Sequence, residues 1–194
     1  MTTKQDDRRP RWDQVARRWW ATIQGKHEDT APRRGSDRAA LARLRRAATP
    51  VEALEEPTVF DLYKKLGFDR IDIDRRLPRV AVVAAVLAHI KEDATLAESG
   101  FRRRFAEILG QGERPLMSEL RFKRLLAATE DQVLMTSFRR AVALAAGKNI
   151  DVGDVAASLL DWSDRRRMRW AFDYYGAAIA APKKNETAST ETED

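Results

Sequence analysis

Residues 118–148 read SELRFKRLLAATEDQVLMTSFRRAVALAAGK, which is the pattern of two consecutive amphipathic helices. At about 100° per residue, Phe122, Leu125 and Leu126 lie on one side of the first helix. The apolar side of the second helix is formed by Leu134, Phe138, Ala141 and Ala145. Such stripes predict two helices that bury one face each and leave the opposite face to solvent.

Cations flank both apolar stripes. Arg121 and Arg124 lie on one edge of the first stripe and Lys123 on the other, while Arg139 and Arg140 lie on opposite edges of the second. Lys148 follows the second helix. These charges are therefore expected on ordered helices rather than on a tail, which indicates a binding surface of fixed geometry.

Local signals predict where the helices begin and end. Thr129 is the expected cap of the second helix, with Gln132 closing a capping box. Gly147 is the expected stop. Further along, Asp151 is the expected cap of a short helix that precedes the last one.

Composition limits the class of protein. A chain of 194 residues, 43% hydrophobic, is long enough for one domain or for two small ones that share a core. The absence of cysteine excludes disulfides, thiolate zinc sites and a cysteine nucleophile, and it fits a cytoplasmic location. No apolar run approaches the roughly 20 residues of a membrane span, and residues 1–9 lack the apolar core of a signal peptide.

Charge is unevenly distributed along the chain, whose net charge is +6. Residues 1–46 contain 13 Lys and Arg against 6 Asp and Glu, and residues 101–148 contain 10 against 5. If these two segments meet in space, they form a basic face that attracts polyphosphate. The alternative is a solvated surface of mixed charge.

Helical periodicity continues through most of the chain, and no convincing strand pattern occurs. The sequence therefore predicts an all-α fold, a compact bundle of about nine helices that can divide into two helical subdomains. The expected parts are a disordered N-terminus (1–9), an N-terminal helical part (10–113), a C-terminal helical part (114–181) and a disordered acidic tail (182–194).

Three finer expectations concern single segments. Trp19 and Trp20 are interpreted as core anchors, although aromatic side chains can also stack on nucleic-acid bases. Residues 68–77 are interpreted as an irregular connection, with Pro78 opening the next apolar helix. Residues 25–35 are expected to form a basic loop.

No catalytic residues, no metal site and no cofactor are predicted. His27 and His89 have no second ligand at metal-binding spacing, and His89 is expected to be a structural residue. Asp69, Asp72 and Asp74 are more typical of a salt-bridge cluster than of a magnesium site. The sequence also lacks a phosphate-binding glycine loop and a nucleophile elbow, so binding is the favoured activity.

Two other functions are compatible with these features. Residues 154–160 and the helix from Asp164 can be interpreted as a helix-turn-helix of a transcriptional regulator, with Arg165, Arg166, Arg167 and Arg169 facing DNA. Against this, Trp170, Phe172, Tyr174 and Tyr175 are expected to require burial on the same helix. A scaffold whose basic face meets an acidic protein is the third possibility.

Four groups of residues, taken in order, resemble a known family. They are Trp19 and Trp20; Arg38, Ala39, Leu41, Leu44, Arg45, Arg46 and Pro50; Ser118, Glu119, Arg121, Phe122, Leu125, Leu126, Arg139, Arg140, Ala141 and Val142; and Trp162, Trp170, Ala171, Tyr174 and Tyr175. With these four groups, the chain resembles the CasB family over about residues 12–178. CasB is the small subunit of the type I-E CRISPR surveillance complex Cascade. Phe138, where the family usually has Leu, and a longer loop at 25–35 depart from the pattern.

The resemblance implies an all-helical, non-catalytic protein that forms a homodimer within Cascade. Its partners would be the other Cascade subunits, guide RNA and target DNA, and it would stabilise the R-loop by holding nucleic-acid backbones. Carried over by position, the family's basic motifs correspond to Arg38, Arg45, Arg46, Arg121, Arg124, Arg139 and Arg140. Lys123 and Lys148 are added from the helical pattern.

Overall fold

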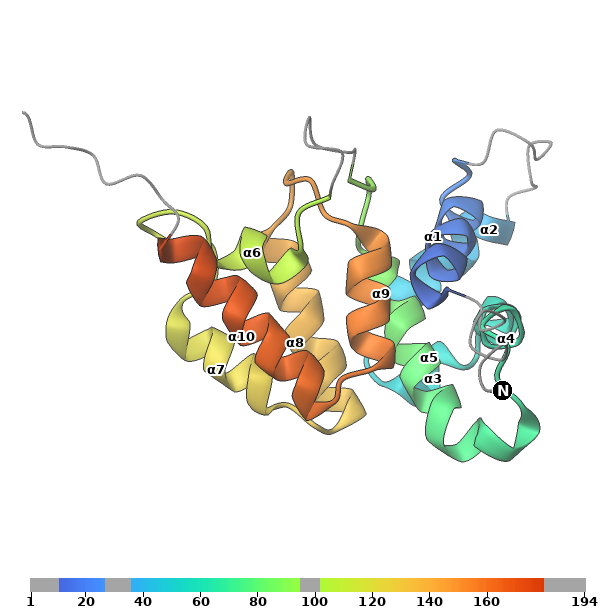
Figure 1. Cartoon of the computed structure of the whole chain (residues 1–194). Coiled ribbons are helices and arrows are strands. Elements are labelled where there is room, and N and C mark those ends of the chain that lie inside the picture. The colour runs from blue at the N-terminus through green and yellow to red at the C-terminus, as the bar shows by residue number, and fades with distance from the viewer. Residues whose placement is uncertain (1–10, 27–35, 95–101, 180–194) are drawn as a thin grey trace, which may run out of the picture.

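The computed structural model describes residues 11–26, 36–94 and 102–179. These residues form ten α-helices and one short 3-10 helix, without a strand among them, so the predicted all-α fold is confirmed (Figure 1). The helices are α1 (Trp12–Ile23), α2 (Ser36–Arg46), α3 (Pro50–Ala53), α4 (Pro57–Lys65), η2 (Arg70–Asp72), α5 (Ile73–Leu87), α6 (Phe105–Gly110), α7 (Glu119–Ala127), α8 (Asp131–Leu144), α9 (Val152–Leu160) and α10 (Asp164–Ile179). The expected disordered ends, 1–9 and 182–194, and most of the loop 25–35 lie outside the described residues.

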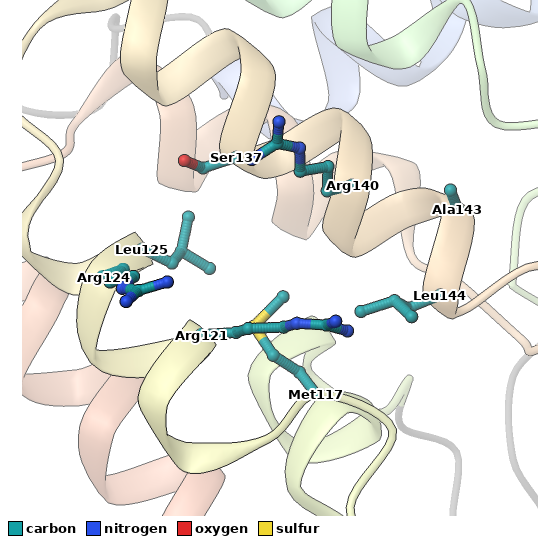
Figure 2. A pocket seen from close by; sticks show the side chains of 8 residues that line it. All are labelled: Met117, Arg121, Arg124, Leu125, Ser137, Arg140, Ala143 and Leu144. Carbon is teal, nitrogen blue, oxygen red and sulfur yellow. The ribbon is translucent and has the colours of Figure 1, made fainter.

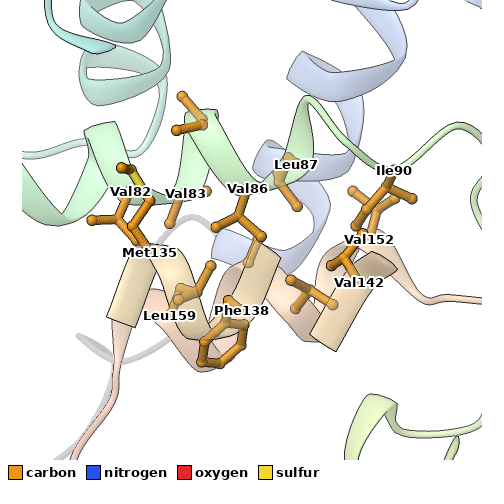
Figure 3. Close-up of a cluster of buried hydrophobic side chains, with 14 of the residues drawn as sticks. Val82, Val83, Val86, Leu87, Ile90, Met135, Phe138, Val142, Val152 and Leu159 are labelled. Carbon is orange, nitrogen blue, oxygen red and sulfur yellow. The ribbon is translucent and has the colours of Figure 1, made fainter. Parts of the chain in front are cut away.

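Helix α5 is the centre of the molecule. Every residue from Val80 to Leu87 is buried, because this second half of α5 is apolar on all sides and α5 is covered by α3 and α4 on one side and by α8 and α9 on another. Figure 3 shows Val82 and Val86 of α5 facing Met135 and Phe138 of α8. One cluster of buried side chains continues from α1 to α10, so the helices share a single hydrophobic core.

The expectation that residues 68–77 form an irregular connection is wrong. The 3-10 helix η2 leads directly into α5, which begins at Ile73, five residues before Pro78. A proline inside a helix removes one backbone donor and crowds the preceding turn. The buried run that follows, together with the ion pair between Arg79 and Asp131 (2.9 Å), holds α5 against α8 and compensates for that loss.

The two adjacent tryptophans of α1 are core anchors, as predicted. Trp19 and Trp20 are 2% and 3% exposed. Each indole N–H has an acceptor within the fold: Trp19 Nε1 donates to the Thr58 carbonyl and Trp20 Nε1 to the Ile90 carbonyl, both at 3.0 Å. Their rings are therefore covered by protein and are not available as base-stacking surfaces.

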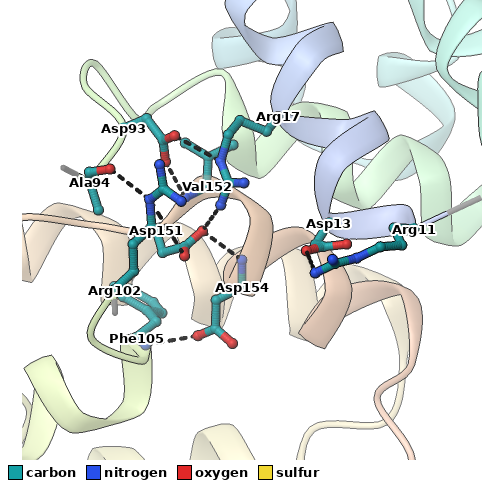
Figure 4. Close-up of polar contacts among 10 residues, drawn as sticks. All are labelled: Arg11, Asp13, Arg17, Asp93, Ala94, Arg102, Phe105, Asp151, Val152 and Asp154. Carbon is teal, nitrogen blue, oxygen red and sulfur yellow. Dashed lines mark hydrogen bonds and ion pairs between the residues drawn. The ribbon is translucent and has the colours of Figure 1, made fainter. Parts of the chain in front are cut away.

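An ion-pair cluster connects α1 to α9 (Figure 4). Arg17 of α1 pairs with Asp93 (2.8 Å) and with Asp151, which precedes α9. Asp151 also accepts a hydrogen bond from the Asp154 N–H (3.0 Å), which confirms it as the cap of α9. Burial raises the pKa of Asp154, whose carboxylate accepts the backbone N–H of Phe105 (2.8 Å). The start of α9 thereby joins α1 and α6.

The connection between α7 and α8 differs from the expected capping box. Helix α8 begins at Asp131, and neither Thr129 nor the N-cap residue Glu130 caps it with a side chain. The amide of Gln132 donates instead to the Ala48 carbonyl (2.7 Å), just beyond α2, and with Glu130 as N-cap Gln132 is the second helical residue, whereas a capping box uses the third. Gly147 has a φ of 78° beyond the end of α8, in agreement with the predicted stop.

Helix α10 buries one side only. Trp170 and Tyr174 are buried, and Tyr174 stacks on Phe122 of α7 with ring centres 3.8 Å apart. The expectation that Phe172 and Tyr175 are buried is wrong, because these residues are 71% and 38% exposed. Side chains two positions apart on an α-helix point in directions that differ by about 200° around the helix axis. Because Trp170 and Tyr174 face the core, Phe172 between them faces solvent.

Candidate nucleic-acid interface

Helices α7 and α8 border a pocket of about 510 Å³ (Figure 2). Arg121 and Arg124 line it from α7 and Arg140 lines it from α8. The remainder of its lining is mostly apolar and consists of Met117, Leu125, Ser137, Ala143 and Leu144. The two amphipathic helices thus bring three of the predicted cations together around one opening.

The guanidinium groups of these three arginines lack partners in the part of the chain that the structure describes. All three residues are exposed, and within the described part of the chain no ion pair or side-chain hydrogen bond involves Arg121, Arg124 or Arg140. Each guanidinium keeps five N–H donors, in a planar fork that matches two phosphate oxygens. The pocket is therefore suited to bind phosphate groups.

The neighbouring Arg139 is directed into the protein. Its guanidinium donates to three backbone carbonyls, those of Ala47 (2.5 Å), Leu44 (2.8 Å) and Ala85 (3.4 Å). Burial lowers the pKa of Arg139. The side chain therefore ties α8 to the end of α2 and to α5, whereas Arg140, about 100° further around the helix, faces outward.

Helix α2 carries the first predicted basic motif. Arg38 and Arg46 are exposed, and neither has a side-chain partner among the residues that the structure describes. Arg45 is half-buried and its Nε donates to the Ala88 carbonyl (2.7 Å). Arg45 and Arg139 both lie near His89, whose pKa is lowered by burial first and then by these two positive charges. His89 is thus a partly buried structural residue, as expected.

The two predicted lysines lie apart from the pocket. Lys123 forms an exposed ion pair with Glu119 (2.7 Å), which raises the pKa of Lys123 and lowers that of Glu119. Lys148 is exposed beyond the end of α8 and borders a different pocket, which His89 and Gly147 also line. Lys123 is therefore partly neutralised by its own helix, and Lys148 extends the basic surface elsewhere.

A second arginine cluster combines three residues that the sequence placed only in the alternative helix-turn-helix with Arg104, which the sequence did not assign to a site. Arg104, Arg165, Arg166 and Arg169 border a pocket of about 550 Å³ beside α10. The i, i+4 spacing of Arg165 and Arg169 was visible in the sequence, but their proximity to Arg104 depends on how α6 packs against α10.

The described residues contain no group of three His, Asp or Glu side chains arranged to hold a metal ion. None of the described helices combines the length and the apolar composition that crossing a membrane requires.

Comparison with known proteins identifies the family. The family model of the CRISPR-associated protein Cse2 matches residues 40–175. The chain belongs to the Cse2 family. The resemblance to CasB proteins found in the sequence is therefore confirmed, and the match includes the basic residues of α7 and α8 and most of those of α2.

Solved structures of other proteins share the fold. The chain is 29% identical to CasB from Thermus thermophilus, with 86% of this chain and 98% of that chain covered and a TM-score of 0.62. A second structure of a Cse2-family protein from Thermus thermophilus is 30% identical with the same coverage and a TM-score of 0.60. A chain in the E. coli Cascade complex with a PAM-containing double-stranded DNA target is 18% identical, covers 86% of this chain and 97% of that one, and gives a TM-score of 0.56. No curated protein matches the sequence.

Proposed function

We propose that this Cse2-family chain is a non-catalytic small subunit of a type I-E Cascade complex and holds nucleic acid by its backbone. The observation that carries the proposal is that the exposed guanidinium groups of Arg121, Arg124 and Arg140 border one pocket and have no partner among the described residues. Membership of the Cse2 family, and the fold shared with a chain of the DNA-bound E. coli Cascade, support the assignment to the complex.

Backbone contacts suit the formation of an R-loop. Phosphate contacts position a strand without reading its sequence, and the exchange of a DNA duplex for a guide–target hybrid is nearly balanced in free energy. A few arginines that hold the hybrid or the displaced strand can therefore shift the exchange towards the open state. The proposed partners are guide RNA, target DNA, other Cascade subunits and a second copy of the chain, in the cytoplasm.

The predicted residues divide into two roles in this proposal. Arg38, Arg46 and Lys148 extend the surface that faces nucleic acid, because they are exposed and have no partners among the described residues. Arg45 and Arg139 hold the helices that carry this surface, since their side chains donate to backbone carbonyls. Lys123, paired with Glu119, would contribute a weaker contact.

The test is a triple variant, Arg121→Gln, Arg124→Gln and Arg140→Gln, titrated at several salt concentrations onto two unrelated single-stranded DNA sequences and onto the duplex of each. We expect equal weakening for both single strands, and a plot of log affinity against log salt that is shallower by about 2, since each phosphate contact to a single strand contributes about 0.7. Arg18→Gln, Lys64→Gln and Lys65→Gln, three exposed cations on α1 and α4, form the matched control.

Two results would contradict the proposal. A loss confined to one duplex sequence would favour the helix-turn-helix regulator, because base contacts and not phosphate contacts distinguish sequences. Unchanged binding of all nucleic acids by the triple variant would favour the scaffold, whose basic face binds an acidic protein.

Cascade assembled with the triple variant should open target DNA less efficiently than Cascade with the control.

A further inference from the structure

The arginines beside α10 form a cluster with a defined geometry. Asp173 is 5% exposed and lies beneath two of them. Its carboxylate accepts a hydrogen bond from Arg169 Nε (3.2 Å) and pairs with Arg104 Nη1 (3.7 Å). The side chains of Arg104 and Arg169 remain 41% and 53% exposed, so one buried acid fixes two guanidinium groups whose other donors face solvent.

The cluster keeps an excess of positive charge. Arg166 pairs with Asp161 at 3.9 Å, and the side chain of Arg165 has no partner among the described residues. Four arginines thus border the pocket against the carboxylates of Asp161 and Asp173. An anion that enters the pocket would meet several donors already oriented by the protein, which is the arrangement that arginines use for phosphate.

An exposed aromatic ring adjoins these arginines. Arg165, Arg169 and Phe172 lie on the same side of α10, and the Arg169 guanidinium is 5.8 Å from the centre of the Phe172 ring. Phe172 is 71% exposed and Met168, beside it, is 67% exposed. Burial in the core of this chain therefore does not account for the ring. Arginines next to an exposed aromatic side chain are the elements with which proteins hold single strands.

This surface differs from the α7–α8 pocket. On α8, Arg140 lies about 160° around the helix from Phe138, whose ring is 5.1 Å from that of Trp170 on α10. Arg140 therefore faces away from α10, and the two arginine clusters share no residue. In Figure 1, α10 crosses the front of the bundle, with α8 behind it.

We propose that the outer face of α10 is a second nucleic-acid site, specific for single strands. A backbone phosphate binds among Arg104, Arg165 and Arg169, and the neighbouring base stacks on Phe172. A duplex cannot occupy this site fully, because its bases are already stacked on one another. An acidic peptide would bind the arginines without contacting the Phe172 ring. The inference rests on the proposed function, to which it adds a second path for a strand.

The experiment compares three variants of the full-length protein on a fluorescent single strand and on the matching duplex. Phe172→Ala should weaken single-strand binding about 10-fold, with the salt dependence and duplex binding unchanged, because the variant loses stacking and no charge. Phe172→Tyr should bind like the wild type. Arg165→Gln with Arg169→Gln should make the salt dependence on single strands shallower by about 1.4.

Matched controls separate this site from general effects. Ile71→Ala shortens an apolar side chain that is 97% exposed, and Lys64→Gln with Lys65→Gln removes two exposed charges on α4. Neither should change single-strand binding as the α10 variants do. Thermal unfolding of the Phe172, Ile71 and lysine variants should match that of the wild type, since these side chains are exposed, whereas the arginine double variant should melt somewhat lower because the buried Asp173 loses a donor.

The outcomes distinguish this inference from the proposed function. If the α7–α8 triple variant binds weakly while the α10 variants bind like the wild type, the second site is refuted and the proposed function stands. If Phe172→Ala weakened single-strand and duplex binding equally, the second site would also be refuted, because loss of base stacking would not explain the effect. If the α10 variants bind DNA normally and lose other Cascade subunits, the face is a protein interface. If the wild type binds no single strand, both proposals fail.

Discussion

Arg139 and Arg140 are adjacent in the chain and have different environments. Arg139 donates to three backbone carbonyls and is half-buried, whereas Arg140 is exposed at the edge of a pocket. A carbonyl that loses its donor when buried is left without a hydrogen bond, and this raises the free energy of the folded state. The two positions therefore allow a structural effect to be separated from a binding effect.

At residue 139 we predict a large loss of stability. Arg139→Gln should lower the free energy of unfolding by about 3 kcal/mol, because a shorter side chain cannot reach all three carbonyls. Arg140→Gln should change it by less than about 0.5 kcal/mol, as exposed substitutions usually do. Urea unfolding followed by circular dichroism measures both. Similar losses in the two variants would show that the Arg139 contacts do not stabilise the fold.

At His89 we predict a dependence on pH. Burial, reinforced by Arg139 and Arg45, lowers the pKa of His89, so the unfolded chain binds the proton more readily than the folded one. The resulting stability is complete above the unfolded pKa of about 6.5 and is lost as pH falls below it. When the pH falls from 7.5 to 5.0, the wild type should therefore lose more unfolding free energy than the His89→Gln variant, which has no imidazole to protonate. A constant difference would contradict this.

At the scale of the helices, α6 and α10 approach each other very closely at Gly110. A Cβ atom built on Gly110 would lie 2.2 Å from the Tyr174 carbonyl oxygen, a distance that no side chain can occupy. Gly176, on the same helix as Tyr174, has no atom within 4 Å of such a Cβ. Glycine at residue 110 thus allows the two helices to pack backbone against backbone.

We predict opposite effects of alanine at these two glycines. Gly110→Ala should destabilise the protein by about 3 kcal/mol, because α6 must move away from α10. Gly176→Ala should stabilise it by about 0.5 to 1 kcal/mol, because alanine restricts the unfolded chain and fits a helix without contact. Denaturant midpoints of the two variants test this, and a neutral Gly110→Ala would show that the interface can adjust.

At the scale of the whole molecule, the core joins the two halves of the chain. Helix α5, from the first half, packs on α8 and α9 of the second, and α1 is tied to the start of α9 by Arg17. The arginine clusters are therefore mounted on a framework to which both halves contribute.

This framework predicts that neither half folds alone. Chains of residues 1–113 and 114–194 should each show little cooperative unfolding, because each would expose the apolar surface that the other covers. Mixing the two should restore helical signal if they associate. Cooperative melting of either isolated half, measured by circular dichroism, would refute the single-framework description and support independent subdomains.

The sequence by itself determined the helical class, the buried tryptophan pair of α1, the capping of α9 by Asp151, and the family. These follow from local periodicity and from the spacing of side chains, which a linear chain displays directly. It also placed Arg121, Arg124 and Arg140 on the flanks of two consecutive amphipathic helices, among the nine cations expected to bind nucleic acid.

Only the tertiary structure decided which cations face solvent. Arg139 is directed inward because carbonyls at the end of α2 lie beside it. Gln132 donates to the Ala48 carbonyl and does not form the expected capping box. Helix α10 buries one side against α6 and α7. This packing brings Arg104 and Arg169 to the same carboxylate, that of Asp173, and leaves Phe172 exposed on the opposite side. Such contacts join residues far apart in the chain, and they depend on which helix faces pack, which local pattern does not specify.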